Sequence, residues 1–342
     1  MRPNFFHHLH PPTLPAQQSR WRYTLGAGGT AVFLMMVLLV TGMLEMFFYV
    51  PTPEQAALSI QTITYHVPLG GVIRNLHFWS AQILMVVMTV HLIRVVFTGA
   101  YLPPRRFNYL LGMVLFVTAI LLNFTGYVLR WDQGIQWALV VGTNLVETVP
   151  VVGDSFYRIL TGGSQLGQAT LTRFYAWHVF GLFLPAVIMV GWHIFRVRRD
   201  GGIAVPPPAM RSDDERITRY ELVRREVSAM LLISAALLVL SGVLPAPIAP
   251  PITDLDAAVS DNGAPWFFLW VQQMLAWGDP LFWGVGVPLA ILAVFSLIPY
   301  LFPKPAESEQ GRWFPKSNRI ASYTVAAISI AIICLTLLSL VP

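Results

Sequence analysis

The amino-acid sequence predicts an all-α, polytopic membrane protein with about seven transmembrane helices. Hydrophobic residues make up 55% of the 342 residues and charged residues only 11%, with a mean hydropathy of +0.61. Such a composition is too apolar for a soluble protein of this length. The apolar residues also gather into segments of about 20 residues, the length that an α-helix needs to cross the hydrocarbon core of a bilayer.

Seven successive segments meet this criterion. They cover residues 28–49, 75–98, 109–129, 174–195, 228–247, 281–302 and 320–341. The N-terminus does not show the basic start, short apolar run and small-residue cleavage site of a removable signal peptide, so we expect the first segment itself to direct insertion. Residues 205–226 combine clustered charges with helix-breaking prolines, which predicts a cytoplasmic linker between two parts, residues 1–204 and 227–342.

Lysine and arginine are concentrated in alternate connections between these segments. They are Arg2, Arg20 and Arg22 in the N-terminal arm; Arg94 in the last turn of the second segment, with Arg105 and Arg106 after it; eight arginines from Arg196 to Arg225 after the fourth; and Lys304, Arg312, Lys316 and Arg319 after the sixth. The other connections hold only Arg158 away from the segment ends. By the positive-inside rule we expect the N-terminus in the cytoplasm of a prokaryote and the C-terminus outside its inner membrane. The net charge of +5 is then a signal of topology and not of nucleic-acid binding.

Four histidines form two pairs, His77 with His91 and His178 with His193, each inside one apolar segment. In a helix, intervals of 14 and 15 residues amount to about four turns, so the members of a pair lie on nearly the same face, roughly 21 Å apart. The second and fourth segments run in the same direction, so His77 and His178 are expected near the outer face and His91 and His193 near the inner face.

Haem ligation explains this pattern better than structural hydrogen bonding does. A single buried histidine is equally compatible with a polar contact between helices, but four at matched spacing favour ligands. One imidazole on each side of a haem iron gives a six-coordinate electron carrier with no open position for dioxygen. We therefore predict two haems, His77/His178 outside and His91/His193 inside, and electron transfer across the bilayer.

Glycines repeat the interval of the first histidine pair. Gly28 and Gly42 lie in the first segment, and Gly112 and Gly126 in the third, each pair 14 residues apart. Ordinary packing of small residues between helices is the alternative explanation. The shared interval favours clearance for a flat ring, because glycine lets such a ring approach a backbone closely.

Three arginines lie close to the histidines. Arg74 precedes His77 by three residues, Arg94 follows His91 by three, and Arg173 precedes His178 by five. Haem propionates are anionic and need neutralisation in a low dielectric, so we expect these arginines to bind them. The alternative is that they extend to the membrane surface. The lone cysteine, Cys334, has no Cys-x-x-Cys-His motif around it, so no covalent haem is expected.

With these features the chain resembles cytochrome b, the diheme quinol-oxidising subunit of cytochrome bc complexes. The matching stretches are residues 73–99 (IRNLHFWSAQILMVVMTVHLIRVVFTG), 124–133 (FTGYVLRWDQ), 142–153 (GTNLVETVPVVG) and 169–193. The intervals of 14 and 15 are similar to those of the chloroplast and firmicute branch, which also has an extra haem on a cysteine near the first span. Gly26 lies near that position here, so a third haem is not expected. The resemblance implies two non-covalent b haems in a four-helix bundle, fused to a three-helix C-terminal part.

The resemblance also implies an outer site that oxidises quinol. In the family, a Pro-Glu-Trp-Tyr segment between the fifth and sixth spans supplies a proton-accepting carboxylate. Here the glutamate is replaced by Pro265 and the tyrosine by Phe267, and neither can accept a proton. Asp132 and Glu147 are candidate replacements, and Tyr127 matches a family tyrosine that lines this pocket. Asp132 and Glu147 are equally compatible with solvated loop positions.

The resemblance further implies an inner site that reduces quinone. Arg225 and Glu226 open the fifth span, where the family commonly has a basic residue followed by an acid that contacts the quinone. A carboxylate beside a cation can hold or deliver a proton as the quinone is reduced. An ordinary charged helix start is the alternative.

Two functions are compatible with these residues. The first is a quinol-oxidising cytochrome b of a quinol:cytochrome c-type oxidoreductase, which works with a Rieske-type iron–sulfur protein and a c-type cytochrome, as a homodimer embedded in membrane lipid. The second is a haem-bearing membrane anchor that exchanges electrons between the quinone pool and an extracytoplasmic redox subunit without bifurcation. The second function remains an alternative because Pro265 replaces the family glutamate.

Overall fold

Seven helices of the computed structural model are long and apolar enough to cross a membrane, within the described residues 10–206, 215–255 and 263–341. This confirms the predicted all-α, polytopic fold. The spans are α3 (Ala27–Met46), α5 (Gly70–Phe97), α6 (Arg106–Val128), the continuous helix α9–η2–α10 (Gln168–Ala176, Trp177–Leu182, Phe183–Arg199), α11 (Arg219–Val243), η5–α13 (Leu281–Gly286, Val287–Leu301) and η7–α14 (Lys316–Asn318, Arg319–Leu338).

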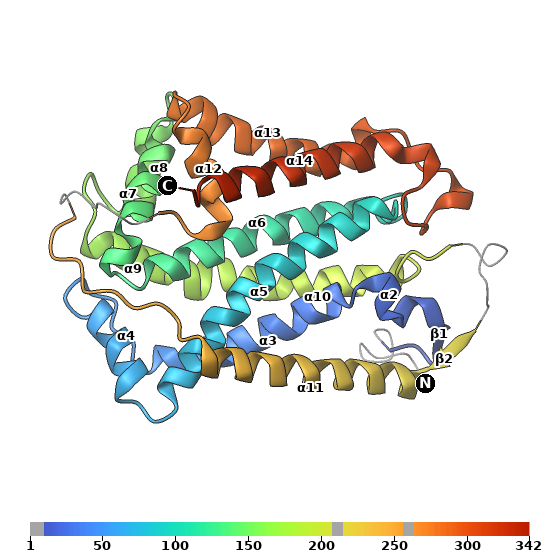
Figure 1. The fold of residues 1–342 in the computed structure, drawn as a ribbon, viewed down its shortest axis with the longest axis horizontal. Coiled ribbons are helices and arrows are strands. Elements are labelled where there is room, and N and C mark those ends of the chain that lie inside the picture. The colour runs from blue at the N-terminus through green and yellow to red at the C-terminus, as the bar shows by residue number, and fades with distance from the viewer. Residues whose placement is uncertain (1–9, 207–214, 256–262, 342) are drawn as a thin grey trace.

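Short elements join these spans at the two ends of the molecule (Figure 1). At one end lie α4 (Ala56–Tyr65), α7 (Gln133–Glu147), α8 (Gly153–Thr161), η4 (Trp266–Phe268) and α12 (Leu269–Leu275). At the other lie β1 (Thr13–Pro15), η1 (Ala16–Ser19), α2 (Trp21–Thr24), β2 (Arg216–Thr218) and η6 (Glu307–Glu309). Following the expected topology, we call the first the outer end and the second the inner end.

The first four spans form a bundle, and the last three pack on two sides of it. Helix α3 packs along α5, and α10 packs along α6. Helix α11 lies against α5 and α3 on one side, and α13 and α14 lie against α6 and α5 on the other (Figure 1). Since lipid tails are as apolar as leucine, these contacts are stabilised by close packing and hydrogen bonds and not by exclusion of water.

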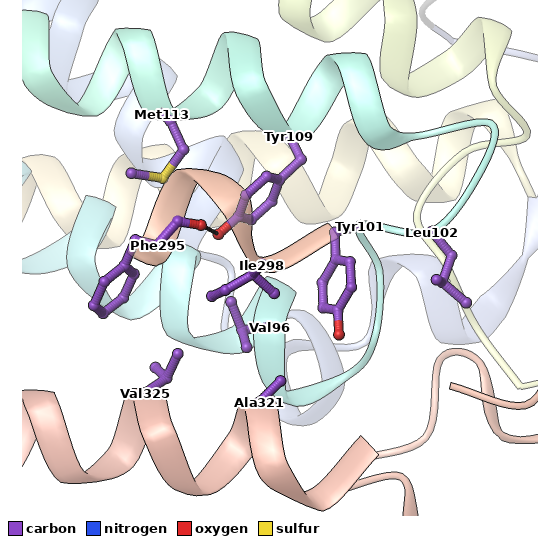
Figure 2. Packing of buried hydrophobic residues seen from close by; sticks show 9 residues of the cluster. All are labelled: Val96, Tyr101, Leu102, Tyr109, Met113, Phe295, Ile298, Ala321 and Val325. Carbon is purple, nitrogen blue, oxygen red and sulfur yellow. Dashed lines mark hydrogen bonds between the residues drawn. The ribbon is translucent and has the colours of Figure 1, made fainter. Parts of the chain in front are cut away.

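One buried cluster joins the bundle to the C-terminal helices (Figure 2). Val96 of α5, Met113 of α6, Ile298 of α13 and Val325 of α14 meet there. The Tyr109 hydroxyl donates to the Phe295 carbonyl at 2.6 Å, so a buried polar group is satisfied across the same interface. The two parts of the chain are therefore held together within the membrane-spanning layer.

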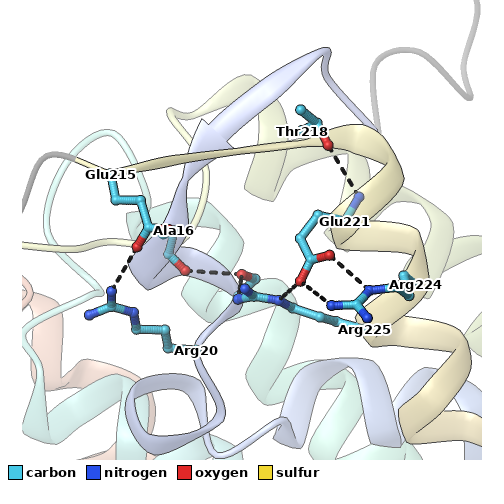
Figure 3. A network of polar contacts seen from close by, with 8 residues as sticks. Ala16, Arg20, Glu215, Thr218, Glu221, Arg224 and Arg225 are labelled. Atoms are coloured by element: carbon cyan, nitrogen blue, oxygen red, sulfur yellow. Dashed lines mark hydrogen bonds and ion pairs between the residues drawn. The ribbon is translucent and has the colours of Figure 1, made fainter.

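At the inner end the N-terminal arm pairs with the segment that leads into α11. Strand β1 is antiparallel to β2, with Leu14 opposite Ile217. Figure 3 shows the polar contacts around this pair, including Arg20 with Glu215 at 3.1 Å. Helix α11 begins at Arg219, inside the segment expected as a linker, and Thr218 caps it by accepting from Glu221 N at 3.3 Å. Residues 207–214 of that linker lie outside the described residues.

Candidate haem and quinone sites

The four histidines predicted as ligands meet in two pairs inside the bundle. The ring centres of His77 and His178 are 6.4 Å apart and those of His91 and His193 6.5 Å apart, with the rings of each pair steeply inclined at 62° and 77°. Two imidazole nitrogens that bind one metal ion from opposite sides lie about 4 Å apart, since each bond is about 2 Å long. Each ring centre lies farther from the metal than the nitrogen that binds it. The observed distances between ring centres, somewhat longer than 4 Å, therefore agree with one metal ion shared by each pair.

A π-helical turn accounts for the unequal intervals of 14 and 15 residues. His178 lies in η2, a π-helix between α9 and α10. In a continuous α-helix, 14 residues end about 40° short of four turns and 15 residues about 60° past them. A π-turn absorbs one extra residue, so His178 and His193 face α5 together despite the longer interval.

Threonine hydroxyls orient the outer pair of imidazoles. Thr41 Oγ1 lies 2.9 Å from His77 Nδ1, and Thr125 Oγ1 lies 3.0 Å from His178 Nδ1. The hydroxyl of Thr41 donates to Val37 O at 2.7 Å and that of Thr125 to Leu121 O at 2.8 Å. The imidazoles must then be the donors, which puts the proton on Nδ1 and leaves Nε2 with a lone pair for a metal.

Each of the four glycines predicted to give clearance for a haem lies against one of the four imidazoles. A Cβ added at Gly42 would be 3.0 Å from His77 Cε1, and one at Gly126 would be 2.7 Å from His178 Cε1. At Gly28 and Gly112 the added Cβ would be 3.3 Å from Cε1 of His91 and His193, respectively. The imidazole rings thus occupy the space where a glycine has no side chain. This position lets both rings of a pair face each other across the cavity.

Arg74 and Arg94 are buried cations, with 5% and 4% of their surfaces exposed. Arg74 donates to Ala246 O at 3.1 Å and to Pro247 O, and Arg94 lies over the ring of Tyr23 at 4.8 Å. Neither forms an ion pair with a carboxylate of the described residues, and Nε of Arg94 has no hydrogen-bond partner among them. Burial of a cation in this way favours an anionic ligand.

Tyr23 of α2, whose ring contacts the Arg94 guanidinium, lies at the inner end of the molecule. Its hydroxyl lies 2.6 Å from Gly311 O and is also hydrogen-bonded to Ala204 O. Burial raises the pKa of Tyr23, and the nearby positive charges of Arg94 and Arg105 oppose that shift. The phenol therefore stays neutral and serves as a hydrogen-bond donor.

Arg173 is placed differently from the other two arginines. It is exposed and donates to the carbonyls of Arg158 and Ile159 at the end of α8. The structure does not bring it to the histidines, because its position on α9 points away from the bundle interior. Its hydrogen bonds complete the C-terminal turn of α8 instead.

One cavity of about 970 Å³ runs through the bundle, and the paired imidazoles open onto it. It is lined by the four histidines, by Gly28, Gly42, Gly112 and Gly126, by Arg74 and Arg94, and by apolar side chains of α3, α5, α6 and α10. Imidazole lone pairs, an apolar wall and buried unpaired cations are the donor set that a haem with anionic propionates requires. The residues present fit haem b.

At the outer end, Asp132 is held in a buried ion pair. It is 2% exposed, and Arg130 Nη2 donates to its Oδ2 at 2.7 Å while Ala249 N donates to the same oxygen at 3.1 Å. Arg130 in turn lies over the Tyr127 ring at 5.3 Å, and the Tyr127 hydroxyl donates to Gly134 O at 2.7 Å. Arg130 and Asp132 thus connect the end of α6 to Ala249 in the chain after α11.

The other outer residues are separated from this cluster. Glu147 is exposed at the end of α7. Ala264 N, next to Pro265, donates to Gln272 Oε1 at 2.7 Å, and Trp266 Nε1 donates to Gln82 Oε1 at 2.7 Å. The segment that replaces the family glutamate therefore packs by hydrogen bonds and has no acid among its own residues.

At the inner end, Glu226 pairs with a residue of the N-terminal arm. His10 Nε2 lies 3.0 Å from Glu226 Oε2, whereas Arg225 contacts Glu221 Oε1 at 2.8 Å and Ser19 Oγ at 2.9 Å (Figure 3). All of these residues except Glu221 line the inner end of the cavity. The expected pairing of Arg225 with its neighbour Glu226 is thus replaced by one between distant segments.

Two residues of the cavity wall were not predicted from the sequence. His10 lies in the polar N-terminal arm and is not part of the regular histidine spacing, and only the fold brings it to Glu226. Glu45 lines the outer half of the cavity. Glu45 could be found from the sequence, since a lone acid inside an apolar span is a functional candidate by default.

Comparison with known proteins identifies the family. A family model described as Cytochrome b/b6/petB matches residues 14–201. Cytochrome b6 from Cyanidium caldarium is 43% identical over 176 residues, which cover 51% of this chain and 81% of that protein. Cytochrome b6 from Heliomicrobium gestii is 38% identical over 174 residues, covering 51% and 82%.

A solved structure shares the fold over most of the chain. A chain of a structure titled "Hyperthermophilic respiratory Complex III" superposes with a TM-score of 0.79 and covers 94% of this chain and 84% of its own length, at 21% identity. At that identity the likeness concerns the fold alone. The sequence match over more than half of the chain and the shared fold together show that this protein belongs to the cytochrome b/b6 family.

Proposed function

We propose that this chain is the diheme b-type subunit of a quinol-oxidising bc-type complex, with His77 and His178 ligating an outer haem and His91 and His193 an inner one. Its family membership makes it a membrane-bound electron-transfer subunit that binds b-type haem. The observation that supports two haems is the pairing of four imidazoles at matched ring distances within one cavity.

Haem b supplies one-electron chemistry when bound, and the chain's residues set its environment. Thr41 and Thr125 hold the outer imidazoles in the tautomer that presents Nε2. Arg74 and Arg94, buried without carboxylate partners among the described residues, would neutralise the propionates. The apolar wall excludes water, which strengthens each of these electrostatic interactions.

The inner quinone site is assigned to the cavity end at Glu226, His10 and Arg225. A carboxylate and an imidazole 3.0 Å apart can share and deliver a proton to a quinone that receives electrons from the inner side. The outer site is assigned to the region of Tyr127, Asp132 and Pro265. There the ion pair of Asp132 with Arg130 favours a positioning role for this acid.

The partners follow from the same assignment. We propose a Rieske-type iron–sulfur protein and a c-type cytochrome as electron acceptors on the outer side, and a homodimer of the complex in the inner membrane of a prokaryote. The cytoplasmic N-terminus and external C-terminus are supported by the concentration of basic residues at the end that holds β1 and β2.

The alternative is a haem-bearing anchor that exchanges electrons with an extracytoplasmic subunit without bifurcation. Two observations favour it: Pro265 replaces the family glutamate, and Asp132 is already paired. In this case the outer end would not oxidise quinol, and the inner end would remain the site of quinone exchange.

A reduced-minus-oxidised spectrum of the purified complex, together with extraction of its haem, tests the proposal. Two non-covalent b haems per chain are expected, and a chain with no haem or a single one would contradict the assignment. Co-purifying subunits then separate the two functions. A Rieske protein supports bifurcation, whereas a multihaem or molybdenum subunit in its place supports the anchor.

A further inference from the structure

Glu45 is the one acidic residue within the seven spans apart from Glu221 and Glu226 near the start of α11. It lies on α3 three residues after Gly42, which contacts His77, and it lines the outer half of the cavity. Its Oε1 is buried and has no hydrogen-bond partner among the described residues. An unpartnered carboxylate in an apolar cavity is costly, and a proton on Oε1 removes most of that cost.

The neighbours of Glu45 are engaged with other groups. The titratable and charged side chains that line the outer half of the cavity are Tyr49 after α3, Arg74 and His77 of α5, Tyr127 and Arg130 at the end of α6, and Tyr175 and His178 of α9–η2. Arg74 attracts Glu45 electrostatically but donates to the carbonyls of Ala246 and Pro247.

The phenol hydroxyls and the arginine of α6 near Glu45 also bind other groups. The Tyr49 hydroxyl donates to Leu129 O at 2.7 Å, that of Tyr127 donates to Gly134 O, and Arg130 is paired with Asp132. The Tyr49 ring also stacks on Tyr175 at 5.7 Å, and burial raises the pKa of Tyr49, so this phenol does not compete for protons. Among the described residues, Glu45 is thus the carboxyl that lines this half of the cavity, and none of the surrounding groups forms an ion pair with it.

We propose that Glu45 exchanges a proton in step with the charge at the outer haem position. Glu45 binds one proton from water at Oε1 as one electron, supplied by a quinol or an electrode, enters the site between His77 and His178. It releases that proton as the electron leaves. One electron and one proton move together, so the net charge of the outer half of the bundle is unchanged. This inference rests on the proposed diheme function.

The rest of the outer end supports this assignment. Pro265 removes the family carboxylate, Asp132 is committed to Arg130 and Ala249, and Glu147 is exposed on the surface. Among the acids of the outer end that the structure describes, Glu45 is the one with a buried carboxyl oxygen in contact with the cavity.

A redox titration of the whole complex at a series of pH values tests the proposal. Because reduction takes up a proton, the potential of the outer haem should fall as pH rises, approaching ~59 mV for each tenfold change in proton concentration. The Glu45→Gln variant should lose this dependence, and Glu45→Asp should retain it. Glu54→Gln, which removes an exposed carboxyl beyond the same end of α3, is the matched control and should behave as the parent protein.

A second readout does not depend on potentials. The reduced-minus-oxidised infrared spectrum should contain the carbonyl band of a protonated carboxyl, absent in Glu45→Gln and shifted in Glu45→Asp. If both haems are present and Glu45→Gln keeps the pH dependence and the band, the proposal is wrong although the diheme function stands. If Glu45→Gln does not assemble, a parent spectrum without a carboxyl band overturns the proposal by itself. A parent protein without the outer haem would instead mean that the proposed function fails.

Discussion

Four glycine–imidazole contacts determine where the histidine rings can lie, and the contact at Gly126 is the tightest. A Cβ there would be 2.7 Å from His178 Cε1, closer than side chains ordinarily approach. Overpacking of this kind costs roughly 1–3 kcal/mol, and ~1.4 kcal/mol is tenfold in a binding constant. Displacement of one ring would therefore weaken binding of the haem that we propose between His77 and His178, without affecting the other pair.

We predict that Gly126→Ala lowers the occupancy or affinity of the outer haem about tenfold or more, measured by haem content per chain and by binding of added haem. Gly191→Ala is the matched control, because an added Cβ at Gly191 in α10 meets no atom within 4 Å. Equal haem content in the two variants would show that the ring at His178 can shift at no cost.

The pairing itself predicts independent loss of the two haems. His91→Ala should remove the inner haem and leave the outer haem reducible, because His77 and His178 lie on other turns of the same helices. The absorbance of the extracted haem should fall to half of the parent value. Loss of both haems from a folded chain would show that ligands are shared differently.

At the scale of elements, the junction after α6 depends on the ion pair between Arg130 and Asp132. Asp132 also forms a β-bridge with Pro251, so the pair fixes the chain that follows α11 against the start of α7. Removing one partner of a buried pair leaves an uncompensated charge, at a cost of about 3–5 kcal/mol.

Asp132→Asn should therefore lower the midpoint temperature of unfolding of the purified complex, followed by circular dichroism. The double variant Arg130→Gln/Asp132→Asn should recover part of the loss, because no lone charge remains. A different result would restore Asp132 as a proton acceptor: unchanged stability with quinol oxidation slowed about 10²-fold, the low end for loss of a general base.

The sequence predicted the helices well where apolar composition defines them, and less well at their ends. The fourth span begins at Gln168 and not near 174, and the fifth at Arg219 and not near 228, because their first turns are polar and lie outside the apolar stretch. The π-turn at η2 was not predictable from composition. Within this turn a Cβ at Gly181 would be 2.3 Å from the Trp177 ring, a close contact that apolar composition does not signal.

At the scale of the whole molecule, one cavity of about 970 Å³ runs between the two ends of the bundle. A ligand that binds only the folded state stabilises it, by ~4.1 kcal/mol at 1,000 times its Kd. Removal of haem should thus lower the unfolding temperature of the complex, and added haem should restore it. His91→Ala, with one haem, should lie between the two. An unfolding temperature independent of haem would mean that the helices pack without it.

In the candidate sites, the sequence predicts features that depend on spacing within one helix better than contacts between distant segments. The histidine and glycine positions follow from regular spacing along single helices, and the structure brings all eight together. The contacts of Glu226 with His10 and of Asp132 with Ala249 join segments far apart in sequence, the N-terminal arm to α11 and the start of α7 to the chain after α11. Such contacts carry no periodic signal, which is why Arg225 was expected beside Glu226 and His10 was not.

The π-turn at η2 also bears on how the length of this helix can vary. An insertion or deletion of one residue in an α-helix rotates everything beyond it by about 100°, which would turn His193 away from His91. At η2 the extra residue is already held in the wider turn. A chain lacking one residue between Trp177 and Leu182 would form continuous α-helix with the shorter interval, and both imidazoles would still face α5. This turn is thus the place in the fourth span where a change in length leaves the ligands in register.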